Sequence, residues 1–112
     1  MPLSHLNTGQ INELKELMED AFEDLINTYL TDSDQKNQLL EEAIVGEDLP
    51  KIAEISHSLK GSSANICALP LSLVFKEIED QARAETLANI ADLFSQSQQE
   101  YQQVKTALKS LL

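Results

Sequence analysis

Apolar residues recur at spacings of three and four along most of the chain, which is the repeat of an amphipathic α-helix. The last segment shows this repeat most clearly. Two series of residues there follow one another at intervals of seven, with Ser97 as the one polar interruption: Leu87, Phe94, Tyr101 and Leu108, and Ile90, Val104 and Leu111. Such a seam packs against near-parallel neighbouring helices. With only three glycines and three prolines, the chain is also too poor in turn residues for sandwiches and barrels, so an all-α fold is predicted.

The first half of the chain leaves two points of organisation open. Thr8 is placed to cap a first helix whose apolar stripe continues to Tyr29, and this stripe alone predicts one uninterrupted helix. The polar stretch 31–38 then has no apolar anchor, so it is either a loop or a helix that projects past the core. The stripe resumes over 39–44, and Gly46 supplies a stop.

Two further helix starts and one connection follow. Asp48 followed by Pro50 is a start signal, because proline is tolerated in the first turn of a helix, and Leu69–Pro70 repeats that signal. Residues 84–86 make a short connection to the last segment. Four long amphipathic segments with short links predict an up-and-down four-helix bundle with a short additional N-terminal helix. Since no linker interrupts the pattern, we expect residues 1–112 to form a single domain.

The balance of charges excludes several classes of partner. Eight basic residues stand against 19 acidic ones, and the resulting net charge of −11 argues against binding to nucleic acid or to anionic membranes. The longest uncharged stretch, between Lys60 and Lys76, is interrupted by Pro70 and is shorter than the ~20 residues of a membrane span. No signal peptide is visible, and a single cysteine forms no internal disulfide. We therefore expect a cytoplasmic protein.

His57 stands out when residues 52–68 are placed on a helical wheel. The apolar stripe lies on the side opposite to it, so the imidazole is predicted to face water. Its own face carries small residues, with Lys60 one turn away: Ala53, Gly61, Ala64 and Ala68. Because a glycine inside a helix costs about 1 kcal/mol relative to alanine, Gly61 is predicted to leave room beside the ring.

This arrangement favours a phosphoryl carrier. Neutral imidazole is the nucleophilic form of histidine, and the ammonium of Lys60 would stabilise a phosphoryl group transferred to the ring. The sequence shows no metal site, general base or nucleotide-binding loop beside His57. The chain is therefore predicted to borrow the rest of its reaction centre from a partner.

The segment from His57 to Ala68 closely resembles the signature of histidine-containing phosphotransfer (HPt) domains of bacterial phosphorelays, His-x-Leu-Lys-Gly-Ser-Ser-x-x-x-Gly-Ala. Every fixed position matches except one, where Cys67 replaces the glycine. Residues 76–83 are similar to the next helix of that family, and the resemblance extends over the whole chain in helix count and order. It also implies that the front segment breaks near Glu19–Asp20 and that the polar stretch 31–38 stays helical.

The resemblance assigns roles residue by residue. His57 would accept a phosphoryl group on Nε2 from an aspartyl phosphate of one receiver domain and pass it to an aspartate of another. Lys60 would contact the phosphoryl oxygens, and Gly61 would clear the approach. On the helical wheel, the small side chains of Ala64 and Ala53 also leave access to the histidine. Glu79 falls where family members often carry a polar side chain that orients the ring. No cofactor is implied on this chain, because Mg²⁺ would be held by the partner receiver domain.

The sequence therefore predicts a monomeric phosphorelay intermediate between a hybrid sensor histidine kinase and response regulators, without autokinase activity. We expect its docking patch to combine the open face around His57 with apolar residues of the front segment, such as Leu14 or Met18. A non-catalytic helical adaptor, in which the histidine is incidental, is the alternative. A mimic of nucleic acid is suggested by the net charge alone.

Overall fold

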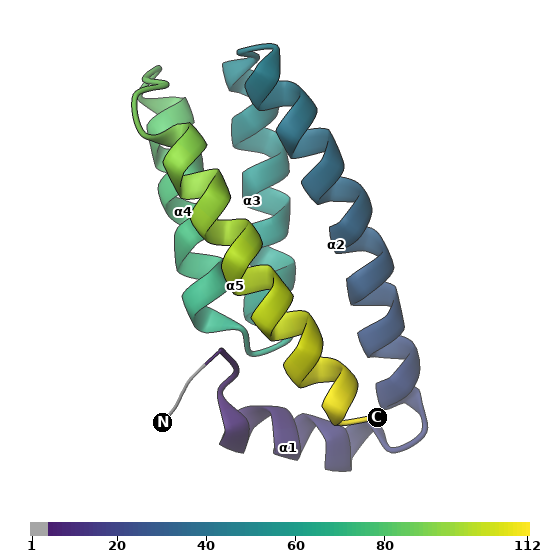
Figure 1. The fold of residues 1–112 in the computed structure, drawn as a ribbon. Helices are drawn as coiled ribbons and strands as arrows, with labels where there is room; N and C mark the ends of the chain where they lie inside the picture. Colours follow the sequence, from purple (N-terminus) through teal and green to yellow (C-terminus); the bar gives the residue numbers. More distant parts are fainter. Residues whose placement is uncertain (1–4) are drawn as a thin grey trace.

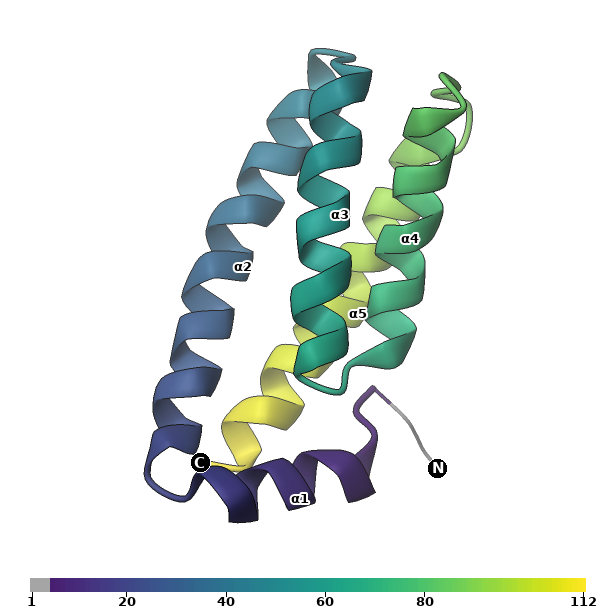
Figure 2. The same cartoon turned by 180° about the vertical axis from the view of Figure 1, so that it is seen from behind.

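The computed structural model describes residues 5–112 and consists of five helices, four of which form a bundle. Helices α2 to α5 lie side by side, and α1 crosses one end of the bundle (Figures 1 and 2). The helices are α1 (Thr8–Met18), α2 (Ala21–Val45), α3 (Leu49–Asn65), α4 (Leu69–Arg83) and α5 (Ile90–Ser110). This confirms the all-α four-helix bundle with a short additional N-terminal helix.

The single helix predicted from the first apolar stripe is wrong, because the chain turns between α1 and α2. Glu19 ends α1 with φ 49° and ψ −119°, and α2 begins two residues later at Ala21. Ile11 before the turn and Phe22 after it are both buried, at 1% and 2% exposure. Periodicity records which residues are buried but not the direction of the chain, so it does not detect this turn, whereas the family resemblance places it correctly.

The polar stretch 31–38 is helical and forms the middle of α2. Two of its residues, Ser33 and Asn37, are buried although both are polar, and Asn37 has a polar partner on α5. Gln98 donates a hydrogen bond from Nε2 to Oδ1 of Asn37 over 2.9 Å. A hydrophilic contact between helices therefore replaces the apolar anchor that the periodicity required.

Most of the predicted helix starts are confirmed, with two shifts. Asp48 caps α3 by accepting a hydrogen bond from the backbone N–H of Lys51, whereas α1 is capped by Asn7 and not by Thr8. Pro50 and Pro70 each lie in the first turn of their helix, where the missing N–H is not needed. Since α5 begins at Ile90, the last connection is longer than 84–86.

Helices α2, α3 and α4 end in the same backbone motif, and the left-handed residue is Glu47, Cys67 and Glu85 respectively. For α3, the N–H of Cys67 donates to the carbonyl of Ala64 at 3.0 Å, and the next N–H donates to Ser63 at 2.9 Å. These are the two hydrogen bonds of a Schellman motif, whose left-handed residue is usually glycine. Gly46 thus precedes the left-handed residue of α2, and Cys67, with φ 67°, replaces the signature glycine where the backbone favours one.

Residues 5–112 contain no helix that combines the length and the apolar composition needed to cross a bilayer.

Candidate functional site

His57 lies in the middle of α3 and faces solvent, as the helical wheel predicts. The apolar stripe on the other side of α3 is buried: Ile52 and Leu59 are 0% exposed, and Ile66, which caps the helix, is 1% exposed. In contrast, 62% of the His57 side chain is exposed. The imidazole is therefore accessible to another protein.

The predicted small residues divide into two groups. Gly61 and Ala64 are exposed on the open face, and a Cβ added at Gly61 would meet no described atom within 4 Å. Ala53 is only 6% exposed, because α4 covers this side of α3, and Ala68 lies beyond the helix end and is fully buried. The wheel did not predict the burial of these two alanines, since it contains neither the neighbouring helix nor the point at which α3 ends.

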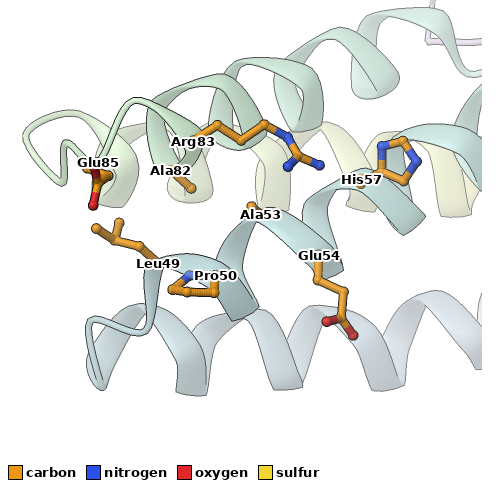
Figure 3. Close-up of a pocket in the computed structure, with 8 residues that line it drawn as sticks. All are labelled: Leu49, Pro50, Ala53, Glu54, His57, Ala82, Arg83 and Glu85. Atoms are coloured by element: carbon orange, nitrogen blue, oxygen red, sulfur yellow. The ribbon is translucent and has the colours of Figure 1, made fainter.

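Ala53 does line the hollow next to the histidine (Figure 3). This hollow, of about 560 Å³, lies between the first half of α3 and the end of α4. His57 stands at one side of it, and the guanidinium of Arg83 extends from α4 towards the ring. The hollow is lined by Leu49, Pro50, Ala53, Glu54, His57, Ala82, Arg83 and Glu85.

A buried carboxylate contacts Nδ1 of the imidazole. Glu79 of α4 has 6% of its side chain exposed, and its Oε2 lies 3.0 Å from Nδ1 of His57. Arg83 donates to the same oxygen from Nε at 2.9 Å and from Nη2 at 2.7 Å. The second oxygen, Oε1, lies 2.8 Å from Nζ of Lys60. One carboxylate therefore joins the histidine to two cations.

The charge of Glu79 follows from these contacts. Burial alone would raise its pKa, but the contacts with Lys60, Arg83 and His57 outweigh burial and lower the pKa to about 2. An ionised carboxylate only accepts hydrogen bonds, so Nδ1 of His57 is the donor. In the neutral ring, Nε2 then carries the free electron pair.

Sequence reasoning predicted one ammonium beside His57, and the structure adds Arg83. The residue was detectable, because Arg83 follows Glu79 by four positions on a predicted helix and such pairs face each other. Lys60 also contacts Glu79. The sequence did not indicate this contact, because it placed Lys60 only one turn from the histidine. Among residues 5–112, no three side chains of His, Cys, Asp or Glu gather as a metal site.

Comparison with known proteins agrees with the predicted family. The family model described as "Hpt domain" matches residues 24–107. The chain belongs to the Hpt domain family. It is also similar to the crystal structure of histidine-containing phosphotransfer protein B (HptB) from Pseudomonas aeruginosa PAO1, with 31% identity and a TM-score of 0.91 over 95% of this chain and 92% of that one. No curated protein matches the chain.

The open face of this Hpt domain differs in charge from the rest of the chain. Of the five described helices, α3 alone has a positive sum of charges, because Lys51 and Lys60 outnumber Glu54. A further cation comes from α2, where Lys36 donates from Nζ to the hydroxyl of Ser58 over 2.6 Å. Helix α3 is therefore slightly positive in a chain of net charge −11, while Lys36 and Lys60 are each paired with a carboxylate, Asp32 at 3.0 Å and Glu79 at 2.8 Å.

The apolar residues expected in a docking patch are placed differently. Leu14 and Met18 of α1 pack partly against the core, whereas Leu17 between them is 82% exposed. A second hollow, of about 250 Å³, lies between α2 and α3, and Leu25, Tyr29 and Ile66 form its apolar part. Leu17 is therefore the most exposed of these three residues, while Leu14 and Met18 remain partly exposed.

Proposed function

We propose that this Hpt protein is a phosphorelay intermediate that carries a phosphoryl group on His57. The donor is an aspartyl phosphate in the receiver domain of a hybrid sensor histidine kinase, and the acceptor is a receiver aspartate of a response regulator. One observation carries the proposal: the imidazole is 62% exposed while a buried carboxylate holds its Nδ1, which leaves Nε2 free for an incoming group.

In the proposed step, the electron pair on Nε2 of His57 attacks the phosphorus atom of the aspartyl phosphate. The N–P bond forms as the P–O bond to the aspartate breaks, and the aspartate leaves as a carboxylate. The ring becomes positively charged while it keeps the proton on Nδ1, and the carboxylate of Glu79 stabilises this charge over 3.0 Å. The reverse sequence delivers the group to the next receiver.

Lys60 and the small residues support this step in different ways. The ammonium of Lys60 is one turn from His57 and is assigned to the phosphoryl oxygens. Gly61 and Ala64 keep the face of α3 low, so that the receiver active site can approach the ring. Because the side chain of Ala53 is small, it leaves the hollow between α3 and α4 open beside the histidine.

The partner supplies the remaining chemistry. Receiver domains collect acidic residues at their reacting aspartate, and the ammonium of Lys60 complements them. Mg²⁺ is held by the receiver and the carrier needs no cofactor of its own. We place the protein in the cytoplasm as a monomer without autokinase activity, and we assign it neither nucleic-acid nor membrane binding.

His57→Gln tests the carrier against the adaptor. The side chain is mostly exposed, so the variant should fold and still bind phosphorylated receivers, but it should accept no label from them. His5→Gln is the matched control, since the second histidine contacts Glu100 and not the site, and it should keep a label that is acid-labile and alkali-stable. Normal signalling through a relay by His57→Gln would favour the adaptor.

A further inference from the structure

We infer that Arg83 is a positioning residue for the proposed transfer: it fixes Glu79 against the ring of His57, so that Lys60 is free to exchange the carboxylate for the phosphoryl group. This inference rests on the proposed function and adds a residue that the family signature does not contain.

The first support is the geometry at a single oxygen atom. Oε2 of Glu79 faces Nδ1 of His57 at 3.0 Å and accepts two hydrogen bonds from Arg83, at 2.9 Å and 2.7 Å. A guanidinium presents its donors in a rigid planar fork, so these two bonds fix the position of this oxygen. The position of the oxygen that orients the ring is therefore set by Arg83.

The second support is the division between the two cations. Lys60 contacts Oε1, at 2.8 Å, and its ammonium is a point charge on a flexible stem. When Lys60 turns towards phosphoryl oxygens, Glu79 loses this partner although only 6% of its side chain is exposed. A buried carboxylate without a partner is strongly unfavourable. Arg83 removes this penalty because it stays on Oε2 throughout.

A second pair on α4 shows what a simple surface contact looks like. Lys76 and Asp80 are also four residues apart and 2.9 Å from each other, but 54% and 58% of their side chains are exposed. Such an exposed pair contributes little. Arg83 differs because its acidic partner is buried and touches the histidine.

The test uses Arg83→Gln and Arg83→Lys, with Lys76→Gln as the matched control. Nitrogen-15 NMR of the His57 ring at about pH 8, where an ordinary imidazole is neutral, reports which nitrogen carries the proton. We expect the Nδ1-protonated form in the parent protein and in Lys76→Gln, and a mixture of both forms in Arg83→Gln. Phosphotransfer from a phosphorylated receiver should slow about tenfold in Arg83→Gln, with partial recovery in Arg83→Lys.

The outcomes separate this inference from the proposed function. An unchanged ring tautomer in folded Arg83→Gln overturns the role of Arg83, whether or not transfer slows. If no receiver phosphorylates the parent protein, the proposed function fails, while the NMR comparison still decides whether Arg83 orients Glu79. Circular dichroism checks the fold, and if Arg83→Gln unfolds, Arg83→Lys decides: a shift of its tautomer from the parent supports the role, and an unchanged tautomer overturns it.

Discussion

Gly61 and Cys67 lie six residues apart, and the backbone at each position would suit the other residue type better. Gly61 is inside α3, where glycine weakens a helix, and the space that a Cβ would occupy is open. Cys67 follows the end of α3 with φ 67°, a conformation that glycine adopts without strain. Folding alone would therefore place a larger residue at 61 and a glycine at 67.

The difference separates a position that packing within the chain explains from one that it does not explain. No described neighbour needs the space beside Gly61, so the fold does not explain the glycine, and we attribute it to the partner proposed to approach His57. At 67 the strain is met inside the chain, because the side chain of Cys67 is 9% exposed and packs in the core. Substitutions at the two positions should therefore move activity and stability separately.

The largest effect is expected from Gly61→Phe, which fills the space beside His57. Phosphotransfer from a phosphorylated receiver should slow by about 100-fold, because a small displacement of the reacting atoms has a large effect on the rate. The smaller Gly61→Ala should slow transfer less and raise the free energy of unfolding by about 1 kcal/mol. Rapid-quench labelling and denaturant unfolding measure the two quantities.

Gly9→Ala is the control for this experiment, since Gly9 lies in α1 and has room for a Cβ, with the nearest atom at 3.8 Å. It should leave the transfer rate unchanged. Transfer by Gly61→Phe at the parent rate would show that the space at 61 serves no partner.

Glu79 resembles Cys67 in this comparison. The cost of burying its carboxylate beside the histidine is compensated by contacts within the chain. Its pKa is lowered to about 2, so its ionised form stabilises the fold above the ordinary value of 4.5, and this contribution is lost as the pH falls towards 2. The difference corresponds to roughly 3 kcal/mol. Between pH 7 and pH 2, the free energy of unfolding should therefore fall more steeply in the parent protein than in Glu79→Gln.

The groups that face this carboxylate are His57 and Lys60 from α3 and Arg83 from α4. Other carboxylates also titrate in this range, but they are shared by the two proteins and cancel in the difference. Parallel curves for the parent and Glu79→Gln would show that the network does not stabilise the fold.

The smallest effect is expected from Cys67→Gly. Relief of the left-handed conformation is worth about 1 kcal/mol, but removal of the buried side chain offsets part of it, while phosphotransfer should not change. Glu47→Gly is the control, because Glu47 is also left-handed, with φ 53°, but exposed. Its gain should approach the full amount, because the effects of its charge on the C-terminus of α2 and on the N-terminus of α3 oppose each other. A larger gain for Cys67→Gly would mean that packing of the thiol does not compensate the strain.

The sequence predicted the bundle and the exposure of His57, because both follow from which face of each helix is apolar. Its periodicity did not predict the turn at Glu19, since buried residues continue the same repeat on both sides of it, whereas the family resemblance did. The burial of Ala53 depends on the position of α4, which no helical wheel contains. Arg83 differs from these cases, because its four-residue spacing from Glu79 on a predicted helix is enough to indicate that the two side chains face each other.

The part of the chain that matches the family begins at residue 24, and α1 therefore lies outside it. Yet Ile11 of α1 belongs to the core, and the N–H of Asn7 donates to the carbonyl of Cys67 over 2.8 Å. We therefore expect the cooperatively unfolding unit to be larger than the region that the family model matches. Shortening the protein to the matched residues would expose the apolar end of the bundle that α1 covers. It would also remove the hydrogen bond that holds the turn after the histidine-bearing helix.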